Sequence, residues 1–169
     1  MKDGKIAVLL PGPPREMKPM FEECAVEVLK KYSELTFISH NIKMIGIGES
    51  SMAEKAEDLL EGRNPTVAPY AKDGECFLRV TSSGKTKEEA EKIAKPVVED
   101  IVERFKDFVY AVDEENIESA LVKLLKKHGL KIALAESCTG GLAAGALVDV
   151  PSASAVLDAS FVTYANDAK

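Results

Sequence analysis

The segment AESCTGG, residues 135–141, places a serine, a cysteine and a threonine side by side, after one acid and before two glycines. It follows a short apolar run and precedes a helix of small residues, so we predict that it connects a strand to a helix. Backbone amides at such a turn can bind a phosphate or an oxyanion. The groups able to do so here belong to Ser137, Thr139, Gly140 and Gly141. The residues alone leave three roles open: a nucleophile, a phosphate-binding loop, or the start of a helix.

A serine becomes a strong nucleophile only when a base lies beside it. Neither histidine of the chain, His40 or His128, is near in sequence, so a Ser-His-Asp triad has no support. A lysine with a lowered pKa can act as the base instead, and a tyrosine can relay the proton. The set that could work in this way is Ser154, Tyr164 and Lys169. A polar loop followed by a strand is the competing interpretation.

Two further loops also lie between a predicted strand and a predicted helix. LPGPP, residues 10–14, contains Gly12, which would let an anionic ligand approach the backbone. The alternative is a rigid strand-to-helix turn, which the spacing alone favours. GIGES, residues 46–50, lacks the third glycine of a dinucleotide-binding loop. We interpret it as a turn with a helix cap at Ser50 or Ser51.

Three groups of elements must position these residues. Residues 5–10 predict a buried parallel strand, followed by an amphipathic helix that reaches Tyr32. A β-α-β-β-α-β unit then follows, with a hairpin at Asp73-Gly74 and a capping box from Thr86 to Glu89. Its predicted elements are residues 37–47, 52–60, 67–70, 75–81, 86–105 and 108–112. The last group is a helix over 117–128 that Gly129 ends, a strand over 131–135, a small-residue helix after Gly141, and a turn with a strand between 155 and 164.

The composition indicates a folded protein of the α/β and α+β classes, with 46% hydrophobic and 30% charged residues. A net charge of -6 argues against a nucleic-acid partner. Three cysteines without a CxxC motif and two isolated histidines indicate neither a disulfide framework nor a zinc site. The sequence has no signal-peptide pattern and no apolar run of ~20 residues, so we expect a cytoplasmic location and no membrane partner.

Together the motifs resemble those of the competence/damage-inducible CinA family. The matching stretches are LLPGPPREMKPMFEE, GIGESSMAEKAEDLL, NPTVAPYAKDGE with FLRVT, IALAESCTGG, LVDVPSASAV and FVTYANDAK, in the family's order and over nearly the whole chain. The resemblance implies that residues 1–34 are the end of a molybdopterin-binding-type domain and residues 35–112 a small α+β middle domain. Residues 113–169 would be the N-terminal part of an α/β deamidase domain. The chain would then be an internal segment of such a protein.

For residues 113–169 the resemblance implies hydrolysis of the carboxamide of nicotinamide mononucleotide to nicotinate mononucleotide and ammonia, without a cofactor. Ser154 would be the nucleophile, Lys169 its base and Tyr164 an assisting group. Ser137 is the second candidate for the nucleophile, and with Thr139, Gly140 and Gly141 it would shape the site. The family usually has Pro-Gly where this chain has Pro151-Ser152, which puts the conformation of the loop before Ser154 in question. The family's further substrate contacts follow Lys169, so the resemblance implies that these residues alone are inactive.

Two other functions stay open. The family's first domain is associated with ADP-ribose pyrophosphatase activity, for which a divalent metal would be the cofactor and Gly12 part of the nucleotide loop. We assign no metal ligands in this chain. The order of elements in the middle unit resembles RNA-binding KH-like folds, but Gly62-Arg63-Asn64-Pro65 lacks the second glycine of their GxxG loop. Exposed sheet edges and apolar helix faces predict a homo-oligomer.

Overall fold

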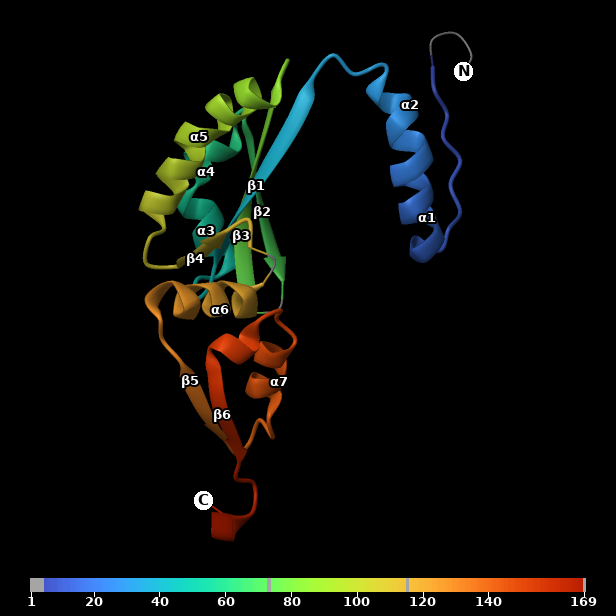
Figure 1. Cartoon of the computed structure of the whole chain (residues 1–169). Helices are drawn as coiled ribbons and strands as arrows, with labels where there is room; N and C mark the ends of the chain where they lie inside the picture. The colour runs from blue at the N-terminus through green and yellow to red at the C-terminus, as the bar shows by residue number, and fades with distance from the viewer. Residues whose placement is uncertain (1–4, 73, 115, 169) are drawn as a thin grey trace.

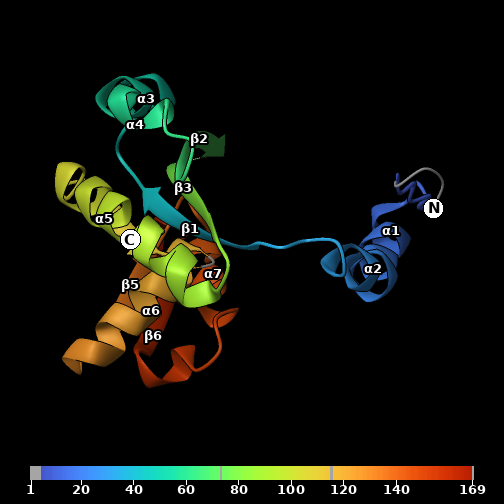
Figure 2. The same cartoon turned by 90° about the horizontal axis from the view of Figure 1, so that it is seen from above.

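The computed structural model describes residues 5–72, 74–114 and 116–168. Its first segment is a single helical rod that stands apart from the rest of the described chain (Figures 1 and 2). The rod consists of α1 (Pro14–Met20), a π-helical segment η1 (Phe21–Ala25) and α2 (Val26–Lys30). The predicted amphipathic helix is therefore confirmed. Its apolar face has few contacts, since Ala25 is the one residue of the rod that is buried among those described.

The prediction of a strand over residues 5–10 is wrong. Beyond an isolated bridge at Lys5, these residues have no regular structure, and Leu9 is 89% exposed. A parallel strand with an apolar sequence is stable only when neighbouring strands and helices cover both of its faces. The described residues supply no such neighbours, so the apolar run alone does not form a strand.

The middle of the chain forms a four-stranded antiparallel sheet with helices on one face (Figure 1). The strands are β1 (Thr36–Met44), β2 (Thr66–Lys72), β3 (Glu75–Gly84) and β4 (Val109–Val112), in the spatial order β2-β3-β1-β4. The helices are α3 (Glu49–Lys55), α4 (Glu57–Leu60) and α5 (Lys87–Arg104). The predicted β-α-β-β-α-β order is thus confirmed, with two helices, α3 and α4, where one was predicted over 52–60.

Alternation along β1 and β3 places one face of this sheet in the core. Ile42 pairs with Leu78 and Met44 with Cys76, and all four side chains are buried. Ile101 of α5 and Phe105, the residue that follows this helix, belong to the same core cluster. Because successive strand residues point to opposite faces, Lys43 and Phe77 lie on the other side of the sheet.

The starts of the helices in this unit agree only partly with those predicted from the sequence. Thr86 caps α5 as predicted, since its hydroxyl accepts from the Glu89 amide at 3.2 Å while the Glu89 carboxylate accepts from the Lys85 amide at 2.7 Å. The predicted cap at Ser50 or Ser51 is wrong: α3 begins after Gly48, without a side-chain cap. The predicted helix over 52–60 is interrupted at Ala56, whose ψ of 8° separates α3 from α4.

The last segment contains a two-stranded parallel sheet with two helices. Its elements are α6 (Ile117–His128), β5 (Ile132–Glu136), α7 (Leu142–Val148), the 3-10 turn η2 (Ala153–Ala155), β6 (Leu157–Val162) and the 3-10 turn η3 (Asn166–Ala168). β5 and β6 run parallel, so both strands end at the same edge. A small core of Val122, Leu147, Ala153 and Val156 joins α6, α7 and η2. Gly129 ends α6 in the left-handed conformation, as predicted.

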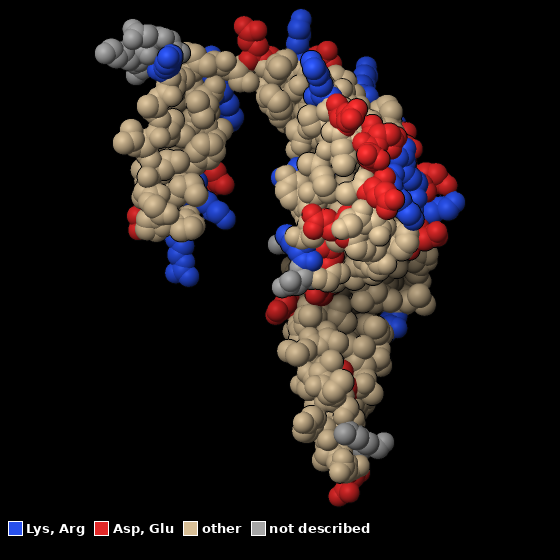
Figure 3. Space-filling view, turned by 180° about the vertical axis from the view of Figure 1, so that it is seen from behind, with Lys and Arg blue, Asp and Glu red and all other residues tan. Residues whose placement is uncertain are grey.

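Acidic and basic side chains are intermingled over the helical face of the middle unit (Figure 3). On the view shown, the part formed by the last segment carries few of them. In the described ranges, no helix is both long and apolar enough to cross a membrane.

The junction between the middle unit and α6 is held by a cluster around His40. The His40 Nδ1 lies 2.6 Å from Asp113 Oδ2, and its Nε2 lies 3.2 Å from Glu91 Oε1. Asp113 also accepts from the Asn41 amide and has a φ of 60°, so it fixes the chain where β4 leads to α6. Partial burial opposes protonation of His40, but the hydrogen bond and charge of Asp113, joined by Glu91, outweigh it and raise the pKa of His40.

This cluster predicts that the stability of the chain depends on pH through His40. A raised folded pKa means that the stabilisation is fully present below the unfolded value of 6.5 and is lost as pH rises through the folded pKa. We therefore expect His40→Gln to lower the free energy of unfolding at pH 5.5 by up to about 1 kcal/mol, and by much less at pH 9. Urea unfolding at the two pH values measures this difference. In the Asp113→Asn background, His40→Gln should lower the free energy of unfolding by less than it does in the unmodified chain. Fully additive effects of the two substitutions would contradict the prediction.

Candidate active site

The turn after β5 is organised by Glu136, a carboxylate that is only 6% exposed. It accepts a hydrogen bond from the Thr139 hydroxyl at 2.7 Å and from the amides of Ala143 and Ala144 at 3.0 and 2.9 Å. The hydrogen bond from Thr139, followed by those from the helix amides, lowers the pKa of Glu136 in spite of its burial. The first turn of α7 therefore already has an anionic partner from within the chain.

Both glycines of this turn are required by its backbone. Gly140 and Gly141 have φ values of 62° and 98°, in the left-handed region that side chains disfavour. A Cβ at Gly141 would also lie 3.2 Å from Val162 Cγ2, so the turn lies directly against the end of β6. The glycine pair thus has a structural role, whatever it contributes to a substrate.

Ser137 and Tyr164 lie at the same edge of the β5–β6 sheet. Ser137 follows the end of β5 directly, and Tyr164 follows the end of β6 by two residues. The Thr163 amide donates to the Glu136 carbonyl at 2.7 Å, which holds the two chain segments together there. Ser137 is half-buried and Tyr164 is 71% exposed. Lys169, the predicted base, lies outside the described residues.

Ser154 lies at the opposite end of β6, in the turn η2 before the strand begins. Ala153 before it and Val156 two residues after it are buried in the core with residues of α6 and α7, while Ser154 and Ala155 between them are exposed. A surface hollow of about 460 Å³ borders it, lined by residues 148–154 and Leu157. Pockets for small ligands commonly have volumes of ~300–1,000 Å³. Within one chain, Ser154 is therefore exposed beside a hollow but is not brought together with Tyr164 or Ser137.

The loop before Ser154 contains a strained residue, Ser152, at the position for which the family resemblance implies a glycine. Ser152 has φ 68° and ψ 17°, a left-handed conformation in which a Cβ is unfavourable. The serine thus adopts a backbone geometry that a glycine adopts at lower cost.

We expect Ser152→Gly to raise the free energy of unfolding by about 0.5–1 kcal/mol, because glycine removes the left-handed strain at φ 68°. Urea denaturation of the two proteins measures the difference. Ser160→Gly, in the middle of β6, is the matched control and should change stability in the opposite direction, since glycine weakens a strand. A loss of stability in both variants would contradict the prediction.

Gly12 lies in the bend before α1 and is exposed. A Cβ there would meet no atom within 4 Å, so nothing in the described structure requires a glycine at this position. Across the described ranges, no group of three or more His, Cys, Asp or Glu side chains could hold a metal ion. The nucleotide-loop role of Gly12 stays a prediction.

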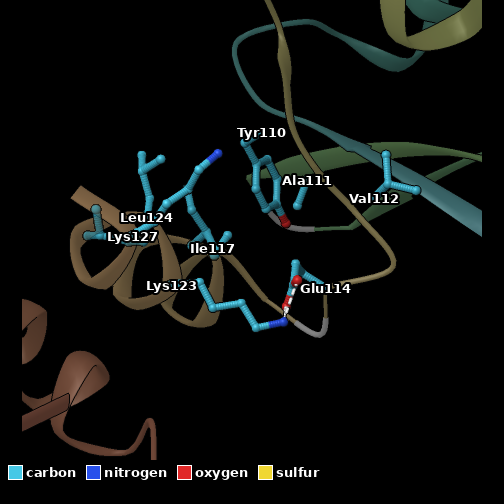
Figure 4. A pocket seen from close by; sticks show the side chains of 10 residues that line it. Tyr110, Ala111, Val112, Glu114, Ile117, Lys123, Leu124 and Lys127 are labelled. Atoms are coloured by element: carbon cyan, nitrogen blue, oxygen red, sulfur yellow. Dashed lines mark hydrogen bonds and ion pairs between the residues drawn. The ribbon is translucent and has the colours of Figure 1, made fainter. Parts of the chain in front are cut away.

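A second hollow, of about 370 Å³, lies between β4 and α6 (Figure 4). Its walls are mostly apolar, with Tyr110 on one side and Lys123 and Lys127 on the other, and Lys123 is paired with Glu114. Of the residues that the structure describes, no serine, threonine or cysteine lines it. The hydroxyl of Tyr110 donates to Glu75, so among the described residues this groove offers no serine, threonine or cysteine nucleophile for acyl transfer, in contrast to the hollow beside Ser154.

Sequence reasoning missed the role of Glu136. The signal was present in the alternation along β5, where Ile132 and Leu134 are partly buried and Glu136 follows on the same face, while Ala133 and Ala135 are exposed. An acid in register with buried residues must find donors, and here these are the Thr139 hydroxyl and the first amides of α7. Asn116, whose side chain caps α6 by accepting from the Ser119 amide at 2.8 Å, was also missed.

Two family models match the chain, one over the middle unit and one over the last segment. Residues 39–111 match the family model described as the damage-inducible protein CinA KH domain, and residues 114–169 match the CinA C-terminal domain. The segment with both candidate serines thus falls within a CinA C-terminal domain match. The chain belongs to the CinA family of competence/damage-inducible proteins.

Individual relatives match almost the whole chain. It is 48% identical over 167 residues to a CinA-like protein of Dictyoglomus turgidum, and 50% identical over 169 residues to a putative competence-damage inducible protein of Clostridium novyi. These alignments cover 98% and 99% of this chain but 41% of each relative, so the chain spans about two fifths of their length. A solved structure of competence/damage inducible protein CihA from Agrobacterium tumefaciens is 49% identical over 30% of this chain and 31% of its own, with a TM-score of 0.30.

Proposed function

We propose that residues 113–169 form part of an amidase that hydrolyses the carboxamide of nicotinamide mononucleotide. The observation that carries the proposal is the setting of Ser154: an exposed hydroxyl, held between the buried residues Ala153 and Val156, at the rim of a hollow of ligand size. The same segment lies in the match to the CinA C-terminal domain, where the family resemblance assigns the nucleophile.

The proposed chemistry is acyl transfer to the Ser154 hydroxyl. Its oxygen attacks the carboxamide carbon, and its proton passes to a base, for which Lys169 is the candidate and Tyr164 an assisting group. The tetrahedral intermediate then collapses. The carboxamide nitrogen takes up a proton and departs as ammonia, and the acyl group remains bound to Ser154 as an ester. Water then hydrolyses the ester to nicotinate mononucleotide and restores the serine. This sequence needs no redox step and no cofactor.

The family resemblance also assigns the loop around Ser137 to the substrate site, although in the described chain this loop lies at the opposite end of β6 from Ser154. The donors of this loop are partly committed within the chain, because Glu136 accepts from the Thr139 hydroxyl and from two amides of α7. A substrate phosphate would therefore have to contact the side of the loop that faces away from Glu136. Close to this carboxylate, the two negative charges would repel each other.

The test uses a chimera, because the resemblance implies that part of the site follows Lys169. The segment of the Dictyoglomus turgidum relative that aligns with this chain is replaced by the corresponding residues of this chain. We expect the chimera to release ammonia from nicotinamide mononucleotide and to form nicotinate mononucleotide, and the isolated 169-residue chain to release none. A folded chimera without this activity, alongside a relative that has it, would contradict the assignment for this chain.

A further inference from the structure

Asp113 and Glu114 join the middle unit to the last segment, and their side chains bind on opposite sides of this junction. The Asp113 carboxylate lies 2.6 Å from His40 Nδ1 and accepts from the Asn41 amide at 2.7 Å, so it is bound to β1. The next carboxylate, that of Glu114, accepts from Lys123 Nζ of α6 at 2.5 and 2.7 Å (Figure 4). Contacts of two neighbouring residues therefore set the direction in which α6 leaves the sheet.

The backbone of Asp113 is held in a conformation that few residues with a Cβ adopt. Its φ of 60° lies in the left-handed region, which aspartate tolerates better than most residues. The Asp113 amide also donates to the Asn41 carbonyl at 2.9 Å, so amide and carboxylate together fix this torsion against β1. Loss of the contact with His40 would let Asp113 relax toward another φ, and this change would turn the chain that enters α6.

The imidazole of His40 lies between two carboxylates from different elements. Asp113 faces its Nδ1 from the loop after β4, and Glu91 of α5 faces its Nε2 at 3.2 Å. The cross-strand partner of His40 on β3 is Val80, and β4 contributes the uncharged Val112 two residues further along β1. Only the protonated ring has a hydrogen on both nitrogens, so only this form can donate to both acids at once. The neutral ring gives up one of these hydrogen bonds and the charge that strengthens the other.

The surroundings of His40 favour the charged ring. Partial burial opposes it, but the hydrogen bond and charge of Asp113, together with Glu91, raise the pKa of His40 above its ordinary value of 6.5. The pair of contacts is therefore complete below pH 6.5 and is lost as pH rises through the folded pKa.

We propose that His40 is a pH-sensitive latch at this junction: the charged ring fixes α6 and the segment that follows it, and the neutral ring lets them turn about Asp113. The inference goes beyond the proposed amidase function and uses none of its residues. Each unit has its own core, one around Ile42 and Leu78 and the other around Val122 and Leu147, so a turn at Asp113 disrupts neither. The two orientations of α6 are the two states that pH would select between.

Energy transfer between two dyes tests the latch in the 169-residue chain. In a background with both exposed cysteines changed to serine and the buried Cys76 retained, the dyes are attached at Glu99→Cys on α5 and His128→Cys at the end of α6. The second substitution also leaves His40 as the one histidine of the chain. We expect a single narrow distance distribution at pH 5.5. At pH 9 a second distance should appear, with a population several-fold larger than at pH 5.5.

Two variants remove the latch from either side. Asp113→Asn keeps the size of the side chain and tolerates the left-handed backbone, but it lacks the charge that binds the imidazolium. This variant and His40→Gln should each show the second distance at both pH values. Asp58→Asn, which changes an exposed partner of Arg104 in the middle unit, is the matched control and should respond to pH as the unmodified chain does. An unmodified chain without a pH response, or a full response in either latch variant, would overturn the proposal.

A dye pair within the middle unit distinguishes a latch from loss of structure. Glu54→Cys in α3 and Glu99→Cys in α5 both lie at exposed positions. The distance between them should be the same at pH 5.5 and pH 9. A change in this pair that accompanies the change at α6 would mean that the middle unit itself loosens, and it would also overturn the proposal.

Discussion

Ser154→Ala should lower the rate of ammonia release from nicotinamide mononucleotide by ~10³-fold or more in the active chimera, as expected for loss of a covalent nucleophile. The substitution removes one exposed hydroxyl and leaves its buried neighbours Ala153 and Val156 in place. The fold of η2 should therefore be unchanged, and the loss should appear in kcat. Nucleotide binding, measured by calorimetry, should change little.

Ser137→Ala is the matched variant, because Ser137 is the other candidate nucleophile. We expect it to lower kcat/KM by ~10-fold or less, as the loss of a substrate contact would. Ser152→Ala controls for a serine in the same loop that has no assigned chemical role. Trapping of an acyl-enzyme, followed by peptide mass spectrometry, identifies the modified serine directly. An ester on Ser137, or a larger effect of Ser137→Ala than of Ser154→Ala, would transfer the nucleophile to the turn after β5.

The middle unit could be predicted from the sequence because its signals are local. The hairpin between β2 and β3, the alternation along β3 and the cap at Thr86 each depend on residues a few positions apart. The strand expected at residues 5–10 could not be judged in this way, since a buried parallel strand depends on neighbours that a local pattern does not specify.

The candidate site shows the same limit more sharply. The sequence predicts Ser137 on the turn after the strand over 131–135 and Ser154 before the last strand, and the structure has both there. Tyr164, predicted at the end of that last strand, instead follows the end of β6 by two residues. That Ser154 and Tyr164 lie at opposite ends of one strand follows only when β6 is given its length and its parallel partner. The contact of His40 with Asp113, which are 73 positions apart, has no local signal at all. The positions of the candidate residues along the chain were therefore easier to predict than their spatial arrangement.

Glu136→Ala should open the first turn of α7 and destabilise the C-terminal segment. It removes the acceptor for the Thr139 hydroxyl and for the amides of Ala143 and Ala144, in a place where the carboxylate is nearly inaccessible to water. Unpaired amides in such a setting are costly. We expect hydrogen–deuterium exchange at Ala143 and Ala144 to accelerate ~10–100-fold, and the melting midpoint to fall by roughly 5–10 °C. Glu99→Gln, at an exposed position in α5, should change neither.

The charge of Glu136 also predicts the direction of a pH effect. Its pKa is lowered in the folded chain, chiefly by the Thr139 hydroxyl and then by the helix amides. A carboxylate of this kind contributes stability that is fully present above the unfolded value of 4.5 and is lost as pH falls through the folded pKa. The difference in melting midpoint between the unmodified chain and Glu136→Gln should therefore be largest above pH 5 and shrink toward pH 3. Glutamine keeps the size of the side chain, so a difference that stays constant with pH would mean that packing, rather than the carboxylate charge, holds the turn after β5.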